Sequence, residues 1–364
     1  MENRTCFLLY PFSILYRLIT DIRNFLFDKG ILRSTKFSIP VICIGNITVG
    51  GTGKTPHAEY IISLLKKEFK VAILSRGYKR KSSGFRIVTS SSKVVETGDE
   101  PLQICRKFPD VLVAVDRNRV NGIKNILREH PETDVIILDD GFQHRWVRPG
   151  LSILLTDYNR LVTRDYIMPY GRLRENMKNR KRADIILISK TPGEITESTI
   201  KEITSEVKTS PGQKIYFTKI CYDALSPVFD GEVSNIFPVT DYRNCGAVLI
   251  TGIASPVLLK IHLEKQFNEI IHLDFPDHYY FNRNDIQKFK KAYNNLKSTK
   301  RLIITTEKDA VRLRELKTIE DPFRSVFYYL PVRISFINDY NTEFDNLISE
   351  YVRQNKRNDR IPQE

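Results

Sequence analysis

A short glycine-rich run that ends in lysine and threonine, Gly50-Gly51-Thr52-Gly53-Lys54-Thr55, has the clearest chemical meaning in this chain. It follows an apolar segment at residues 39–44 that predicts a strand, and it precedes residues 57–67, which predict a helix. Small residues at such a junction allow backbone N–H groups to close around phosphate oxygens, and the helix N-terminus favours negative charge. The run therefore predicts a phosphate-binding loop, in which Lys54 contacts the β- and γ-phosphates and the Thr55 hydroxyl binds Mg²⁺.

The match to the strict loop pattern has one exception. That pattern has a glycine five residues before Gly53, where this chain has Thr48. The alternative is a glycine-rich turn that only connects a strand to a helix. Because the flanking elements lie where phosphate binding needs them, we take the binding of a nucleoside triphosphate as the working hypothesis.

Two adjacent carboxylates, Asp139 and Asp140, follow a second apolar segment at residues 135–138. An aspartate at the C-terminal end of a buried strand is where nucleotide-binding proteins hold Mg²⁺, directly or through water. Adjacent carboxylates near bound phosphate repel each other unless a cation offsets the charge. The pair therefore predicts a magnesium site, and the alternative is an exposed Asp-Asp-Gly turn. Which of the two contacts the metal stays open.

Further groups with reactive or charged side chains follow other predicted elements. Arg76 and Lys79 come after the apolar segment at residues 71–74, where they either face phosphates or form a solvated basic loop. Asp99 is placed to act as a general base, although Gly98-Asp99-Glu100-Pro101 also fits a helix N-terminus. In Asp277-His278 a carboxylate stands beside an imidazole, in which the histidine is more often structural than catalytic.

Composition restricts the class of protein and of partner. The 364 residues are enough for two domains, each with its own core. Lysine and arginine number 57 against 43 aspartates and glutamates, a formal net charge of +14. This surplus indicates an anionic partner: nucleic acid, an acidic lipid surface or a phosphorylated substrate. Five scattered cysteines without a CxxC or Cys/His cluster indicate neither a zinc site nor a disulfide framework, which fits a reducing cytoplasm.

Short, continuous apolar segments alternate with helical stretches, which predicts parallel strands buried on both faces. The fold class is α/β: a nucleotide-binding α/β/α sandwich of the phosphate-loop type with a second, smaller α/β domain. We expect the phosphate-loop domain at residues 29–213, a turn-rich linker at 214–245, the smaller domain at 246–350 and a polar tail at 351–364.

The N-terminal 28 residues predict an amphipathic helix. Apolar residues recur at helical spacing and polar ones take the other side; the apolar set is Leu15, Leu18, Ile19, Ile22, Phe25 and Leu26. No segment has the roughly 18 consecutive apolar residues of a transmembrane helix, and no signal-peptide cleavage site follows. Two interpretations remain open: a helix on a membrane surface, which we adopt, and a helix packed on the first domain.

These motifs together resemble the tetraacyldisaccharide 4′-kinase family, the lipid A 4′-kinases. The resemblance runs in order from about residue 40 to residue 313 and rests on the phosphate loop with Gly45-Asn46 before it, Ser75-Arg76-Gly77-Tyr78, Gly98-Asp99-Glu100-Pro101, Asp139-Asp140-Gly141-Phe142-Gln143-His144, Gly171 with Leu173-Arg174-Glu175, Gly252-Ile253-Ala254-Ser255-Pro256, Asp277-His278 and Thr306-Glu307-Lys308-Asp309-Ala310. Arg172 stands where we expect a small residue or proline, so its role is open, as is that of Lys308-Asp309.

The resemblance implies a kinase with MgATP as donor and the 4′-hydroxyl of a tetraacylated glucosamine disaccharide 1-phosphate as acceptor. It implies that Asp99 removes the hydroxyl proton with His278 in support, and Arg76 and Arg174 are candidates for gripping phosphate. It also implies that the N-terminal helix docks on the cytoplasmic face of the inner membrane. No nucleic acid and no obligate protein partner are expected.

The main alternative is a phosphate-loop GTPase or ATPase for assembly or metal delivery, without a small-molecule acceptor. Such proteins carry an Asn/Thr-Lys-x-Asp element that reads guanine, and Thr306-Glu307-Lys308-Asp309 superficially resembles one. A third hypothesis, a basic membrane- or RNA-binding module, explains the charge but neither the loop nor the aspartate pair, and no RNA-recognition fingerprint is present.

Overall fold

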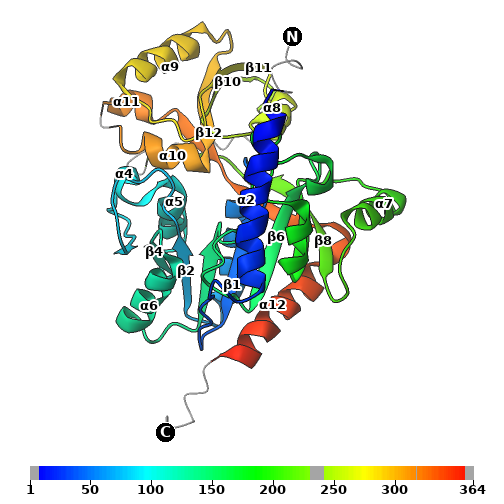
Figure 1. Ribbon diagram of the computed structural model, residues 1–364. Coiled ribbons are helices and arrows are strands. Elements are labelled where there is room, and N and C mark those ends of the chain that lie inside the picture. Colours follow the sequence, from blue (N-terminus) through cyan, green and yellow to red (C-terminus); the bar gives the residue numbers. More distant parts are fainter. Residues whose placement is uncertain (1–7, 230–241, 317, 357–364) are drawn as a thin grey trace.

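The computed structural model describes residues 8–229, 242–316 and 318–356, which form two α/β bodies, each built around its own sheet (Figure 1). The larger body contains the phosphate loop. The smaller body, yellow to orange, sits above one end of the larger sheet, and helix α2 crosses the front of the molecule in the view shown.

The larger sheet has nine strands in the described part of the chain, in the order β14-β8-β7-β6-β1-β5-β2-β4-β3. Only the edge pairs β14–β8 and β3–β4 are antiparallel. Its strands are β1 (Val41–Asn46), β2 (Val71–Ser75), β3 (Arg86–Ile87), β4 (Leu112–Val115), β5 (Val135–Asp139), β6 (Leu151–Asp157), β7 (Ile185–Ser189), β8 (Lys214–Tyr222) and β14 (Val332–Phe336).

The central strands are runs of valine, isoleucine and leucine because helices or loops cover both of their faces. β1, β2 and β5 are buried along their whole lengths. Around them lie α3 (Lys54–Leu65), α4 (Val94–Thr97), α5 (Asp99–Lys107), α6 (Arg119–Glu129), α7 (Glu197–Val207) and α12 (Asn341–Asn355). Since the parallel strands point the same way, β1, β2 and β5 deliver their following loops to one edge of the sheet.

The second sheet has the order β11-β10-β12-β13-β9 among the described residues. It is parallel except for the short edge strand β9. Its elements are β9 (Ser226–Pro227), β10 (Cys245–Thr251), α8 (Val257–Glu264), β11 (Glu269–Asp274), α9 (Arg283–Asn295), β12 (Lys300–Thr306), α10 (Glu307–Leu313), α11 (Asp321–Arg324) and β13 (Phe327–Leu330). Phe289 and Phe327 fill its core.

Two predicted domain boundaries are wrong. Residues 214–222, assigned to a linker, form β8, which pairs with β7 in the larger sheet because Tyr216 and Phe217 bury their side chains there. After the smaller body, the chain returns to the larger one. β14 and α12, which were assigned to the smaller domain and the tail, belong to the larger body. There Phe344 and Ile348 of α12 are part of the core. Of the rest of the predicted linker, residues 226–227 form β9 of the smaller sheet and Cys245 begins β10. Residues 230–241, and 357–364 of the tail, lie outside the described residues.

Helix α2 (Tyr10–Asp28) packs on the larger body through its polar side. Asn24 Nδ2 donates to Glu175 Oε2 over 3.0 Å, and Arg23 Nη2 donates to the Gln143 carbonyl over 2.9 Å. The apolar side faces outward: Leu18, Ile19 and Ile22 are 56, 58 and 50% exposed. The structure therefore does not bury the apolar side of α2 against the first domain, which was the alternative left open by the sequence. No helix in the described ranges is long and apolar enough to span a membrane.

Candidate active site

The glycine-rich run forms a tight loop between β1 and α3, as the sequence predicts. Gly50 and Gly53 have φ values of 105° and 81°, which side chains other than glycine rarely adopt. Asn46 Nδ2 donates to Thr52 Oγ1 over 2.8 Å, and Ser189 Oγ donates to the Thr52 carbonyl over 2.8 Å. α3 then begins at Lys54, so its first N–H groups point toward the loop. Ordered backbone around an N-terminal dipole fits a polyphosphate.

Two contacts that the sequence did not predict hold this loop in place. Residues 172–174 run beside it: the Val49 N–H donates to the Arg172 carbonyl over 2.8 Å and the Arg174 N–H to the Ile47 carbonyl over 2.7 Å. Thr48, the exception in the motif, pairs there with Leu173. His57 contacts the Gly53 carbonyl through Nδ1 over 2.7 Å. Burial lowers the pKa of His57 to about 4, so this histidine is neutral and structural.

Asp140 lies across from the loop and is ion-paired. Lys54 Nζ lies 3.5 Å from Asp140 Oδ1, and Arg174 Nη1 donates to Asp140 Oδ2 over 3.1 Å. Burial alone raises the pKa of a carboxyl, but the charges of Lys54 and Arg174 outweigh burial and hold the pKa of Asp140 below its ordinary value. The residue directly after β5 therefore places a charged carboxylate beside Lys54.

Asp139, the last residue of β5, is in the opposite situation. Its side chain is buried, and Oδ1 has no hydrogen-bond partner. Burial, with the nearby charges of Glu100 and Asp140, raises the pKa of Asp139 to about 7. A buried carboxyl with an unpaired oxygen beside a second carboxylate fits a site that a divalent cation completes. No cluster of three or more His, Cys, Asp or Glu ligands exists in the described ranges, so phosphate oxygens would have to supply further ligands.

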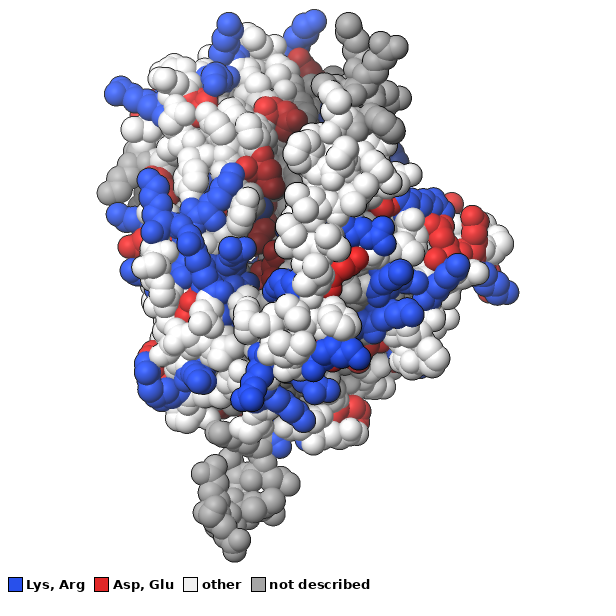
Figure 2. All heavy atoms as spheres, in the orientation of Figure 1, with Lys and Arg blue, Asp and Glu red and all other residues white. Residues whose placement is uncertain are grey.

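Both bodies line one cavity of about 630 Å³ that contains the loop. Figure 2 shows its surface as a narrow vertical groove with acidic side chains along it. The larger body contributes Lys54, Thr55, Glu100, Asp140 and Arg174, and the smaller body contributes Ser255, Asp277, His278, Glu307 and Lys308. The predicted phosphate loop and His278, which are more than two hundred residues apart in the sequence, thus face the same space.

Asp99 and His278 meet across the two bodies, as the resemblance implied. His278 Nδ1 lies 2.9 Å from Asp99 Oδ2. Arg312, on α10, donates to the same carboxylate. Although burial opposes ionisation, the contacts with His278, Lys308 and Arg312 hold the pKa of Asp99 well below its usual range. Asp99 is only 3% exposed, so of this pair His278 is the side chain that lines the cavity.

Arg76 is exposed and does not line this cavity, whereas Arg174 does. Arg312 was missed because its contact with Asp99 is formed only between domains. Its position four residues after Lys308 on one helix, which places both on one face, was the available signal. The buried Arg119, whose Nη2 donates to the Asp139 carbonyl over 3.2 Å, had no signal of its own.

The guanine-reading alternative for Thr306-Glu307-Lys308-Asp309 does not fit the structure. Asp309 is fully buried, where it accepts hydrogen bonds from the Gly252 N–H and the Thr306 hydroxyl and is paired with Arg312. With these contacts the Asp309 carboxylate ties α10 to the loop after β10, and it is not available to a nucleotide base.

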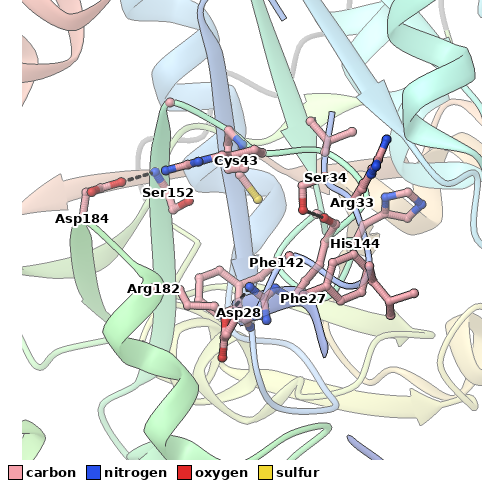
Figure 3. A pocket seen from close by; sticks show the side chains of 18 residues that line it. Phe27, Asp28, Arg33, Ser34, Cys43, Phe142, His144, Ser152, Arg182 and Asp184 are labelled. Carbon is pink, nitrogen blue, oxygen red and sulfur yellow. Dashed lines mark hydrogen bonds and ion pairs between the residues drawn. The ribbon is translucent and has the colours of Figure 1, made fainter. Parts of the chain in front are cut away.

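A second cavity, of about 830 Å³, lies under the C-terminal end of α2 (Figure 3). Phe27 and Asp28 of the helix, Cys43 of β1 and Arg182 are among its lining residues. Burial raises the pKa of the Cys43 thiol to about 12, so the thiol is unreactive near neutral pH. None of the residues predicted to bind nucleotide, metal or acceptor lines this cavity.

Comparisons with known proteins agree with the motifs. The family model described as tetraacyldisaccharide-1-P 4′-kinase matches residues 5–353. A tetraacyldisaccharide 4′-kinase of Parabacteroides distasonis is 46% identical over 347 residues, which cover 95% of this chain and 94% of the relative. One of Flavobacterium johnsoniae is 44% identical over 96% of this chain and 97% of the relative. The crystal structure of LpxK from Aquifex aeolicus in complex with ATP has a TM-score of 0.71 at 28% identity, over 94% of this chain and 98% of that one.

The unpaired state of Asp139 predicts a gain in stability when its charge is removed. A carboxyl whose pKa rises from 3.8 to about 7 binds protons more tightly in the folded state, so stability falls as the pH rises through this window. We expect Asp139→Asn, without nucleotide or metal, to melt roughly 2–4 °C above the wild type at pH 8 and to show little gain at pH 4.

Asp140→Asn is the matched control, because the pKa of Asp140 is lowered and its charge is paired. It should lower the melting temperature at pH 8. Thermal melts of both variants at the two pH values measure this. A lower melting temperature for Asp139→Asn at pH 8 would contradict the assignment of Asp139 as an uncompensated buried carboxyl.

Proposed function

The chain belongs to the tetraacyldisaccharide-1-phosphate 4′-kinase family, and we propose that it transfers the γ-phosphate of ATP to the 4′-hydroxyl of a tetraacylated glucosamine disaccharide 1-phosphate in lipid A biosynthesis. The observation that carries this proposal is one cavity in which the phosphate loop and the Asp99–His278 pair approach from different bodies. Transfer to an acceptor requires both a phosphate cradle and a base, whereas nucleotide binding alone requires only the cradle.

In this proposal the loop amides of residues 50–55 and Lys54 hold the ATP phosphates. Lys54 exchanges its ion pair with Asp140 for the β- and γ-phosphates. Thr55, with Asp139 and Asp140, would hold Mg²⁺, and the bound ion would supply positive charge to offset the negative charge on the transferring group. The solved relative whose description names ATP supports the nucleotide, and the unpaired Asp139 oxygen supports the cation.

The Asp99–His278 pair removes the proton from the acceptor hydroxyl. The sequence assigned the proton to Asp99 with His278 in support, but the burial of Asp99 under Arg312 favours the reverse arrangement. Asp99 accepts the Nδ1–H of His278 and orients the ring, and His278 Nε2 contacts the hydroxyl. Arg174 neutralises charge near the transferring phosphoryl group because it lies beside Asp140. Arg76 does not line the cavity, and its proposed role is to bind the phosphate of the acceptor.

The outward apolar side of α2 supports docking on the cytoplasmic face of the inner membrane, where the lipid acceptor resides. Figure 2 shows a largely uncharged surface over α2 with basic side chains beside it, a combination that favours an anionic bilayer surface. Neither nucleic acid nor an obligate protein partner belongs to the proposal. The GTPase alternative is not favoured, because Asp309 is occupied by structural contacts.

The proposal is tested with γ-labelled ATP, Mg²⁺ and a bacterial lipid extract, followed by identification of the labelled lipid. We expect label on the 4′ position of the acylated disaccharide. Lys54→Ala should reduce the rate at least about a hundredfold, because about 3 kcal/mol of electrostatic stabilisation is lost. Label that appears only as free phosphate, with GTP as effective as ATP, would favour the GTPase or ATPase alternative.

The paired action of Asp99 and His278 predicts non-additive losses. Asp99→Asn and His278→Ala should each lower kcat by about 10²-fold or more with little change in ATP binding, and the double variant should be little worse than either single variant. Steady-state kinetics with varied ATP and acceptor measure this. Melting curves are the control, since Asp99→Asn removes one of the two carboxylates that pair with the buried Arg312. Multiplicative losses in folded variants would show that the two residues act independently.

Membrane docking through α2 predicts a change in partitioning. Leu18→Glu with Ile22→Glu should release the protein from anionic vesicles, and activity on membrane-embedded acceptor should fall further than activity on detergent-dispersed acceptor. Leu18→Gln with Ile22→Gln separates lost apolar area from added charge, and Tyr340→Glu, at an exposed position on the larger body, is the matched control. Co-sedimentation and melting curves measure both effects. A lower melting temperature with unchanged vesicle binding would mean that these residues serve packing.

A further inference from the structure

Lys308 has no role in the proposed chemistry, yet it occupies a central position in the cavity. It is the second residue of α10, within the Thr306-Glu307-Lys308-Asp309 motif. Of the described residues that line the cavity, it is the only lysine or arginine from the smaller body. The other cations of this lining, Lys54, Arg172, Arg174 and Lys190, all come from the larger body. Among the described lining residues, Lys308 is thus the one lysine or arginine charge that the smaller body brings to the cavity.

Three polar groups hold the Lys308 ammonium. Nζ donates to Glu100 Oε1 over 3.0 Å and to His278 Nε2 over 3.1 Å, and it lies 3.5 Å from Asp277 Oδ1. Burial favours the neutral amine, but the charges of Glu100, Asp99 and Asp277 outweigh burial and raise the pKa of Lys308 above its ordinary value. Lys308 therefore stays protonated and acts only as a donor.

The Lys308 contact selects one tautomer of the His278 ring. Since an ammonium only donates, Nε2 must accept with its lone pair. The ring proton is then on Nδ1, which donates to Asp99. This is the tautomer of a competent base. The lone pair that would receive the acceptor's proton is nevertheless occupied by Lys308 in this structure.

Two donors cannot share this lone pair, so the acceptor hydroxyl and Lys308 compete for it. Lys308 has a flexible four-carbon stem and lines the same cavity as the phosphate loop. Bound ATP would bring a γ-phosphate with more negative charge than either Glu100 or Asp277 carries. A triphosphate in the loop therefore offers Lys308 a stronger partner than the ones it has without nucleotide.

We propose that Lys308 is a nucleotide-responsive positioning residue: without a γ-phosphate it caps His278 Nε2, and with ATP bound it moves to the γ-phosphate and frees that nitrogen for the acceptor hydroxyl. This inference rests on the proposed kinase function. His278 Nε2 then takes the hydroxyl proton as the oxygen bonds to the γ-phosphorus, and the bond between that phosphorus and the β–γ bridging oxygen breaks, with its electron pair leaving on ADP. When ADP and the phosphorylated acceptor leave, His278 Nε2 releases its proton to water, and Lys308, which has lost the γ-phosphate as partner, returns to that nitrogen.

The state of Nε2 is measured directly by NMR of protein labelled with ¹⁵N-histidine. The His278 resonances are identified by their absence in His278→Asn. In the wild type we expect the Nε2 resonance to move on addition of Mg²⁺ with a non-hydrolysable ATP analogue, and to stay in place with Mg²⁺ and ADP. Lys308→Met should have the shifted resonance without any nucleotide. A wild-type Nε2 resonance that is the same without nucleotide, with ADP and with the analogue would overturn the proposal.

Kinetics give an independent readout. Lys308→Met should lower kcat by about 10²-fold, because a cation at the transferring phosphate is lost, while KM for the acceptor changes less than about threefold. Lys308→Arg keeps the charge and should recover at least about a tenth of the wild-type rate. Lys290→Met is the matched control, because Lys290 of α9 is also an ion-paired lysine of the smaller body, 3.0 Å from Glu320, but does not line the cavity. It should keep the wild-type kcat.

Melting curves show whether Lys308→Met is folded, and the NMR comparison between nucleotide states does not depend on that variant. A folded Lys308→Met with kcat within threefold of the wild type would contradict the proposal. The NMR readout uses nucleotide alone, without acceptor. If the lipid assay finds no labelled acceptor while Nε2 still responds to the ATP analogue, the proposed function fails and the response of Lys308 to nucleotide stands.

Discussion

The two bodies of this protein are held in register by buried charge around Asp99. Its carboxylate accepts from His278 and Arg312 of the smaller body, while Lys308 pairs with Glu100 and Lys107 with Glu307 next to it. Buried ion pairs cost desolvation energy that their attraction only partly returns, so an apolar interface of the same size would hold the bodies together at least as well. The charged interface instead determines where the catalytic side chains lie. It fixes the imidazole ring against a carboxylate and directs it into a cavity whose opposite wall is the phosphate loop.

The charges in that cavity are arranged for a polyphosphate and a cation that come from outside the chain. Lys54 and Arg174 are paired with Asp140, and Lys308 with Glu100, so the cations that would contact phosphate are held by carboxylates. Asp139 lacks such a partner and has a raised pKa. Bound metal and nucleotide would redistribute these pairs without leaving buried charges unpaired, which explains how a single chain tolerates so many ionisable groups in one space.

Helix α2 lies on the outside of the larger body. Its polar side is tied to residues 143 and 175, close in the chain to Asp140 and Arg174, and its apolar side is left to the surroundings. The same helix therefore contacts the segments that build the cavity and presents the surface expected to meet a bilayer. A lipid acceptor that stays partly in a membrane needs this proximity, because its reactive hydroxyl must reach the loop while its acyl chains remain in the apolar layer.

The sequence by itself determined the elements whose signals are local. Gly50 and Gly53 need backbone angles that other residues avoid, Asp139 and Asp140 end a buried strand, and continuous apolar runs allow little besides a parallel sheet. Only the tertiary structure decided which distant residues meet. β8 and β14 belong to the larger sheet. The sequence did not predict this, because strand pairing depends on neighbours that periodicity does not specify. The contact of Arg312 with Asp99 depends on how the two bodies pack, that of Lys308 with His278 on how the smaller body folds, and the outward side of α2 on how this helix packs on the larger body. A side chain's distant partner leaves no mark on its own local sequence pattern.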